Sequence, residues 1–116
     1  MRSRSLSMER YKLLIDILLN KTISLAERDD AAIDLAEFDE DIVISTLIKV
    51  AQDHLENYII LSSCGTSFAE IILKRNPTYA EIQAYKEKIK SFAQPARFEA
   101  EALINYGKYS YKQTTY

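Results

Sequence analysis

Leu61 to Ile71 is the stretch that decides the expected fold, and it reads Leu-Ser-Ser-Cys-Gly-Thr-Ser-Phe-Ala-Glu-Ile. An apolar run that begins at Leu55 leads into it as an expected helix. Gly65 falls where that helix should stop, because glycine adopts the left-handed conformation of a helix end without a Cβ clash. Ser67 and Glu70 then have the spacing of a capping box, which predicts a new helix. The stretch therefore predicts a tight antiparallel helix pair, and we expect the chain to be a stack of such pairs.

Length and composition indicate one mostly helical domain. The chain has 116 residues, of which 47% are hydrophobic and 28% charged, and it contains only two glycines and two prolines. So few turn-forming residues favour long helices with short connections over many strands. A chain of this length supports a single core. We expect a helical domain over residues 1–107 and a C-terminal tail over residues 108–116.

Apolar residues recur at steps of three and four along most of the chain, which predicts six or seven helices. Asp53 is expected to cap one of them, and Asn76-Pro77 marks a firm break before another. Further capping-box patterns start at Ser24 and at Thr78. The expected helices cover residues 7–20, 24–38, 42–51 and 54–64, then Ser67 to the break, 78–93 and 94–107. The helix over 42–51 is apolar on most sides, so it is expected to form the centre of the fold.

Ala31 to Ala51, which reads Ala-Ala-Ile-Asp-Leu-Ala-Glu-Phe-Asp-Glu-Asp-Ile-Val-Ile-Ser-Thr-Leu-Ile-Lys-Val-Ala, resembles a HEAT-type helical repeat. A second copy is suggested when Asp30–Leu47 is aligned with Glu56–Leu73. The run Ser63 to Ile71 is similar to a Ser-Cys-Gly-x-Ser-x-Ala-Glu-Ile segment of small HEAT-like bacterial proteins. Several of those are immunity proteins of contact-dependent and polymorphic toxin systems. The resemblance covers residues 25–75.

The resemblance to HEAT-like immunity proteins implies both a fold and a function. The implied fold is all-α, with antiparallel helix pairs stacked into a short solenoid or bundle. The implied function is to bind and neutralise one cognate toxin, with no catalytic motif to carry over. The alternative is a HEAT-like adaptor or regulatory protein unrelated to toxins.

Catalytic and metal sites are not expected. Cys64 and His54 are the only cysteine and the only histidine, so an internal disulfide and a zinc signature are excluded. Ten residues on one helix would separate their backbones by about 15 Å, whereas a nucleophile and its base must come within about 3 Å. No phosphate-binding loop, His-Glu-x-x-His or EF-hand spacing occurs. We expect Cys64 to be a buried packing residue, with no enzyme activity and no cofactor.

Localisation follows from two further features of the sequence. No apolar run approaches the roughly 18 residues needed to cross a bilayer. The N-terminus lacks the small-residue cleavage site of a signal peptide. We expect a cytoplasmic protein without membrane contact.

Charge is unevenly distributed along the chain. Residues 16–56 carry eleven acidic and three basic side chains, whereas residues 74–116 carry eight basic and four acidic ones. On the expected helix 24–38, Asp30, Asp34 and Glu37 share one face, with Glu40 and Asp41 just beyond it. Only Arg28 is available to relieve their repulsion locally. This acidic stripe is either a solvated helix face or a docking surface for a basic partner such as a nuclease toxin.

The basic C-terminal third offers nucleic-acid binding as an alternative. Its lysines and arginines could follow a phosphate backbone while tyrosines stack on bases. The candidates are Lys74, Arg75, Lys86, Lys88, Lys90 and Lys108 with Tyr106, Tyr109 and Tyr111. The net charge of −2 and the lack of a DNA-reading motif favour a protein partner instead, for which tyrosine is a common anchor. The predicted partner-binding residues are Asp30, Asp34, Glu37, Glu40, Asp41, Tyr109 and Tyr111.

Overall fold

The computed structural model describes residues 2–107 and the side chains of residues 10–106. Within these residues the chain forms six α-helices and no β-strand, which confirms the all-α prediction and the expected number of helices. The α-helices are α1 (Arg2–Leu19), α2 (Leu25–Asp34), α3 (Asp41–Ala51), α4 (Tyr58–Lys74), α5 (Tyr79–Ile89) and α6 (Gln94–Ala102). A 3-10 turn, η1 (Leu35–Glu37), extends α2, and a π-helical turn, η2 (Leu103–Gly107), extends α6.

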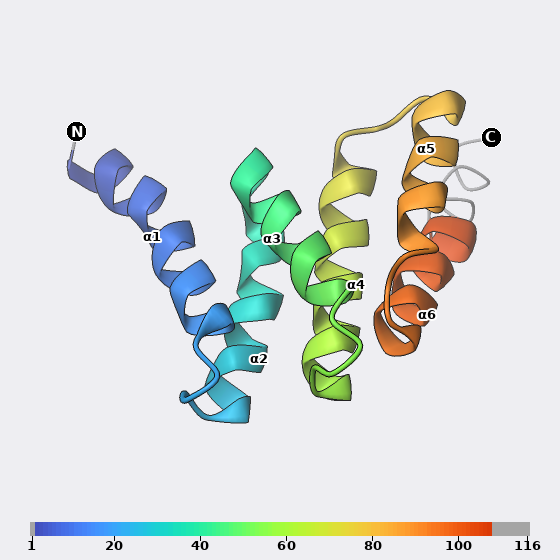
Figure 1. Cartoon of the computed structure of the whole chain (residues 1–116). Coiled ribbons are helices and arrows are strands. Elements are labelled where there is room, and N and C mark those ends of the chain that lie inside the picture. Colours follow the sequence, from blue (N-terminus) through green and yellow to red (C-terminus); the bar gives the residue numbers. More distant parts are fainter. Residues whose placement is uncertain (1, 108–116) are drawn as a thin grey trace.

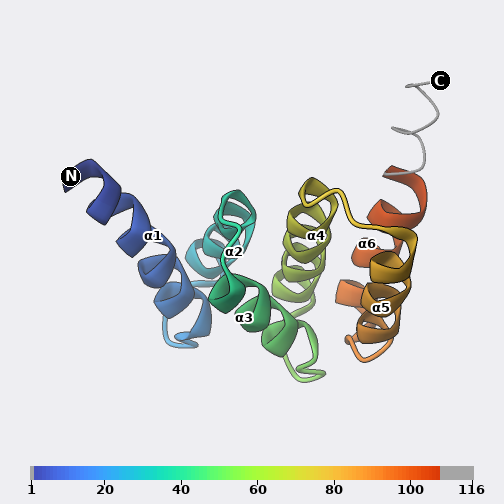
Figure 2. The same cartoon turned by 90° about the horizontal axis from the view of Figure 1, so that it is seen from above.

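The helices form antiparallel pairs that stack side by side. Successive helices run in opposite directions, so the connections alternate between the upper and lower edges of the molecule in Figure 1. Seen from above, α2, α4 and α6 lie in one layer and α3 and α5 in the other (Figure 2). The shortest dimension of the molecule is 21 Å, which matches two layers of helices about 10 Å in diameter. The pairs α1/α2, α3/α4 and α5/α6 thus form the expected short stack.

The predicted helix break at Gly65 is wrong, because α4 runs without interruption from Tyr58 to Lys74. The Ser67 hydroxyl does not cap a helix but donates a hydrogen bond of 2.7 Å to the carbonyl oxygen of Ala32 on α2. The alignment of Asp30–Leu47 with Glu56–Leu73 also fails, since the second segment lies almost entirely within one helix. In the structure the turn within the α3/α4 pair lies between Ala51 and Tyr58.

Gly65 marks a helix crossing instead of a helix end. A Cβ atom at Gly65 would lie 2.2 Å from the carbonyl oxygen of Ala96 on α6. Small residues do let two helix axes approach closely here, but the helices are α4 and α6. The left-handed residue at the end of α4 is Asn76, with φ of 51°, in the Asn76-Pro77 break that the sequence predicts.

The centre of the fold is α4, not the helix over 42–51. Nine residues of α4 are buried, whereas Ile42 on α3 is 53% exposed. The ring of Phe68 on α4 packs edge-on against Phe92 and Tyr85, at centroid distances of 5.3 and 6.1 Å. The prediction was wrong because it took every apolar residue of α3 as buried, whereas the apolar side chain of Ile42 faces solvent.

Capping residues agree with the sequence at two helices and differ at a third. Thr78 and Glu81 form the expected capping box at α5, and the Ser24 hydroxyl accepts the Glu27 amide at α2. The cap of α4 is Asn57, which accepts a hydrogen bond of 2.8 Å from an amide of the first turn. Asp53, the expected cap, lies in the preceding loop.

Candidate protein-binding surface

Five predicted docking residues lie on α2, η1 and the first residues of α3. Asp30 and Asp34 belong to α2 and Glu37 to η1, while Glu40 directly precedes α3 and Asp41 is its first residue. Asp34 is half-buried and the other four are exposed. Together with Asp39 in the same junction, they form what we call the acidic surface. Its η1–α3 part lies at the upper edge of the molecule in Figure 1.

Arg10 of α1 neutralises part of the acidic surface. Its guanidinium lies 3.3 Å from a carboxylate oxygen of Glu37 and 3.6 Å from one of Asp34. The same group lies 5.4 Å from the ring centroid of Phe38, within cation–π range. Phe38 in turn packs against Tyr11, with 5.9 Å between centroids. Arg10 is therefore held in place by an aromatic ring as well as by charge.

Arg75, the residue that ends α4, neutralises the junction between η1 and α3. Its Nε donates a hydrogen bond of 2.7 Å to Asp39, and its Nη2 lies 3.5 Å from Asp41. The hydrogen bond to Asp39 raises the pKa of the Arg75 guanidinium above its usual value. Lys74 beside it donates to the carbonyl oxygen of Ala36 at 3.3 Å. The end of α4 is thus tied to the acidic surface by two cationic side chains.

Two carboxylates of the acidic surface keep no cationic partner. Within the described residues, Asp30 and Glu40 form no ion pair. Six carboxylates lie against three cations, the paired Arg10 and Arg75 and the nearby Lys74, which leaves an excess of three negative charges. The surface is therefore acidic, but less so than its carboxylates alone would indicate.

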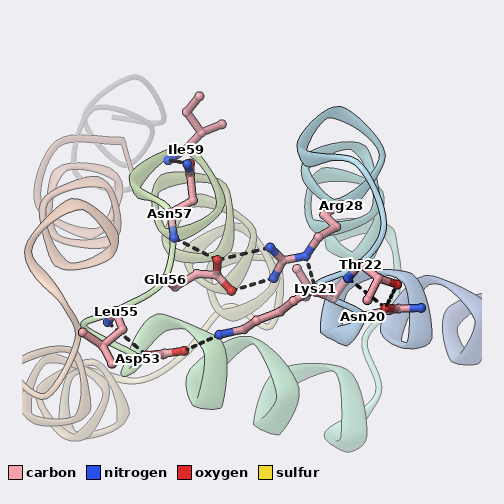
Figure 3. A network of polar contacts seen from close by, with 10 residues as sticks. Asn20, Lys21, Thr22, Arg28, Asp53, Leu55, Glu56, Asn57 and Ile59 are labelled. Carbon is pink, nitrogen blue, oxygen red and sulfur yellow. Dashed lines mark hydrogen bonds and ion pairs between the residues drawn. The ribbon is translucent and has the colours of Figure 1, made fainter.

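Arg28 does not relieve the stripe, contrary to the prediction, because it points into the protein. Its Nη2 lies 2.6 Å from Glu56 in an ion pair with side chains only 7% and 6% exposed. Its Nε donates to the carbonyl oxygen of Leu18 at 2.9 Å, and the Asn57 amide donates to Glu56 at 2.8 Å. These contacts join the end of α1, α2 and the loop before α4 (Figure 3). The hydrogen bond from Arg28 lowers the pKa of Glu56 despite its burial.

Sequence reasoning missed the cations of the acidic surface. Arg10 and Arg75 reach it from other helices, so helical spacing within residues 24–41 carries no sign of them. Asn57 did carry a local signal, because asparagine directly before an apolar helical run is a common N-cap. The charge of Arg28 beside a long acidic stretch suggested a surface pair, whereas the real partner is Glu56.

Cys64 has the environment of a packing residue. It is fully buried, as predicted, and burial raises the pKa of its thiol to about 12. A thiol with so high a pKa stays protonated and is a poor nucleophile. His54 is exposed in the loop before α4, ten residues before Cys64, and the helical part of that separation, Tyr58 to Cys64, alone rises by roughly 9 Å. This arrangement gives no support to a thiol–imidazole dyad.

The basic residues proposed for nucleic-acid binding are partly used within the protein. Lys74 and Arg75 bind the η1–α3 junction, and Lys90 lies 2.8 Å from Glu87. Tyr109 and Tyr111 lie outside the described residues, so their predicted role stays a prediction. Within the described residues no three His, Cys, Asp or Glu side chains are grouped as metal ligands. None of the described helices is long and apolar enough to span a bilayer.

Comparisons of the chain with protein-family models, with curated proteins and with solved structures return no match. The assignment of a site therefore depends on the contacts, charges and burial of the chain's own residues.

Proposed function

We propose that this protein is a bacterial immunity protein of the cytoplasm that binds a cognate toxin domain and neutralises it. The observation that carries the proposal is the acidic surface with its excess of three negative charges. The helices that display it are fixed to one another by buried contacts, among them the ion pair of Arg28 and Glu56. A rigid surface loses little conformational entropy when it binds.

Electrostatics favours a basic partner for the acidic surface. Opposite charges on two surfaces steer their encounter and raise the association rate, particularly at low salt. Toxins that act on nucleic acids need cationic clefts to hold phosphates. A basic nuclease domain is therefore the partner whose chemistry fits best.

The residues of the acidic surface differ in what they can contribute to binding. A cation of the partner can pair with Asp30 or Glu40 without breaking an existing ion pair. At Asp34, Glu37 and Asp41 it has to displace Arg10 or Arg75. Each such exchange breaks one ion pair for every pair that it forms, so it gains less than a new pair does. We therefore assign the main electrostatic contribution to Asp30 and Glu40.

The experiment is to reverse the charge of these two residues. The partner to test is a candidate toxin domain, sought first in the gene next to this one, and binding kinetics and rescue of growth are the measurements. Close interfacial charge pairs couple by about 1.5–7 kcal/mol, so Asp30→Lys with Glu40→Lys should weaken binding by about 100-fold or more. The association rate should fall and depend less on salt.

The matched control is Asp16→Lys with Glu99→Lys, which changes the net charge equally on α1 and α6. Neither residue forms an ion pair within the described residues. Equal effects of the two double variants would mean that only net charge matters. Full protection by the Asp30→Lys, Glu40→Lys variant would refute the acidic surface as the toxin-binding site.

A further inference from the structure

The helices α2 and α4 lie side by side in one layer, and no described helix covers the outward side of the seam between them (Figures 1 and 2). Two hydrogen bonds fix how the helices are aligned. The Ser63 hydroxyl of α4 donates to Asp29 of α2, and the Ser67 hydroxyl donates to the carbonyl oxygen of Ala32. The two helices are therefore parallel, and residues 34 or 35 apart in the sequence lie at the same height.

Two isoleucines lie along the α2–α4 seam. Ile33 follows Asp29 by four residues, so it lies on the side of α2 that faces the seam, and it is 50% exposed. Ile59 precedes Ser63 by four residues on α4 and is half-buried. By the same alignment, Ile59 lies level with residues 24–25 of α2, which is about 12 Å along the axis from Ile33. The seam therefore has two apolar points that are separate from each other.

Two carboxylates alternate with these isoleucines along the seam. Asp30 of α2 is exposed and lies between Ile59 and Ile33 in height. Glu70 of α4 is also exposed and follows Ser63 by seven residues, which is two helical turns. It lies level with residues 35–36 of α2, beyond Ile33. From one end of the seam to the other, the order is apolar, acidic, apolar, acidic.

The four side chains are spaced like the residues on one face of a helix. Counted in helical residues from Ile59, Asp30 lies about 5 positions along the seam, Ile33 about 8 and Glu70 about 11. Residues on one face of an α-helix recur at i, i+4, i+7 and i+11. The long stems of lysine and arginine cover the small offset that remains. A second helix laid along the seam therefore presents one side chain to each of the four points.

No cation of the two helices neutralises the seam. Within the described residues, Asp30 and Glu70 form no ion pair. The two helices have only two basic residues. Arg28 is buried in its own ion pair, and Lys74 is the last residue of α4. The charge of the seam is therefore open to a cation of a partner.

The opposite layer, α3 and α5, carries unpaired charge of the other sign. Within the part of the chain that the structure describes, its helices have three lysines without an ion pair against one such glutamate, namely Lys49, Lys86 and Lys88 against Glu81. A basic helix is therefore attracted to the seam and repelled from the other side of the molecule.

We propose that the α2–α4 seam binds an α-helix of a partner protein whose contact face alternates apolar and basic residues at i, i+4, i+7 and i+11. The apolar side chains pack on Ile59 and Ile33, and the lysines or arginines pair with Asp30 and Glu70. Recognition of an amphipathic helix through such anchors is a common mode of binding. Because Asp30 also belongs to the acidic surface, the seam continues the proposed toxin site, and the inference rests on the proposed function for the identity of the partner as a toxin domain.

The probe is a synthetic helix-forming peptide of 17 residues, the length of α4, with leucine and lysine alternating at the four contact positions. Its control has the same composition, but its two lysines lie on the opposite helix face. NMR shifts of backbone amides locate the peptide on the full chain, and calorimetry measures its Kd. We expect shifts along the seam and about 10-fold weaker binding of the control, whose lysines face away from the carboxylates. Shifts centred on another face, or equal affinities of the two peptides, would overturn the proposal.

Two pairs of variants test the contacts one by one. Ile33→Ser removes an isoleucine from the seam, and its control Ile42→Ser removes one from α3 that is 53% exposed. Glu70→Gln removes a carboxylate of the seam. Its control Glu99→Gln removes one from α6 that forms no ion pair within the described residues. Ile33 and Glu70 are exposed, so their variants should fold, which circular dichroism checks.

Each variant of the seam should weaken binding of the peptide more than its control does. We expect a loss of about 5- to 10-fold for Ile33→Ser and of about 5-fold for Glu70→Gln, with both controls unchanged. Equal effects of a variant and its control would contradict the alternating pattern. Sedimentation velocity tests the remaining occupant. A dimer that is lost in Ile33→Ser would assign the seam to a second copy of the chain and overturn the proposed basic helix.

The peptide experiment and the toxin experiment can fail separately. Glu40 lies at the η1–α3 junction, outside the seam, so Glu40→Lys should affect the peptide less than Glu70→Gln does. If the candidate toxin ignores Asp30→Lys with Glu40→Lys while the peptide maps to the seam, the proposed function fails and the seam proposal stands. If the toxin requires those two residues while the peptide maps elsewhere, only the seam proposal fails.

Discussion

Replacing Gly65 with alanine changes stability by two opposing effects. Alanine in a helix interior is favoured over glycine by about 1 kcal/mol. The added Cβ, however, would lie 2.2 Å from the carbonyl oxygen of Ala96 and 2.8 Å from its Cα, whereas ordinary contact begins at 3.4 Å. All the clashing atoms belong to the backbone, so no side chain can rotate away and α6 has to move by about 1 Å.

The clash outweighs the gain in helix propensity. Overpacking a core costs about 1–3 kcal/mol and occasionally more, and a clash with backbone belongs at the upper end of that range. After the propensity gain, we expect Gly65→Ala to lose about 2 kcal/mol of unfolding free energy. For a chain of this length the corresponding fall in Tm is about 8–10 °C.

Urea unfolding followed by circular dichroism measures this loss. The urea concentration at the midpoint of unfolding should fall. The slope of unfolding free energy against urea concentration should not change, since the surface exposed on unfolding stays the same. Ser62→Ala is the control, because Ser62 lies on the same helix, is only half-buried and should gain a few tenths of a kcal/mol. If Gly65→Ala were as stable as the parent or more stable, the close crossing of α4 and α6 would be refuted.

The buried ion pair gives a second prediction. Arg28→Met leaves the Glu56 carboxylate without its partner and should lower the unfolding free energy by about 3–5 kcal/mol. Adding Glu56→Leu to that variant should restore most of the lost stability. A double variant as unstable as the single one would contradict this explanation. Because the folded pKa of Glu56 lies below its usual 4.5, its contribution is present above pH 4.5 and is lost as pH falls through the folded pKa. Glu56→Gln should therefore flatten the acid limb of the stability curve. The Cys64 thiol, with a pKa of about 12, should resist iodoacetamide at pH 8 until urea unfolds the protein, and rapid labelling of folded protein would contradict its burial.

Most of the fold was predictable because burial of one helix face imposes its spacing on the sequence. The helices over 24–38 and 78–93 lie where periodicity and capping residues put them, within a few residues at each end. Gly65 could not be interpreted in the same way, because glycine serves both as a helix end and as a contact point between helices. The choice depends on Ala96, which lies on another helix. Asn76 was the better stop signal, since its left-handed conformation and the proline after it act on the chain locally.

Charge segregation along the sequence is only partly kept in space. The acidic residues 16–56 are met by cations from both flanking stretches, Arg10 on one side and Arg75 on the other. Helical periodicity shows which residues share a face but not which distant side chains cover it, so these pairs could not be predicted. The proposed basic partner would displace two arginines from four carboxylates and would gain new ion pairs only at Asp30 and Glu40. Its association rate is then expected to depend on the net charge of the whole surface, which salt screens, and its dissociation rate mainly on those two side chains.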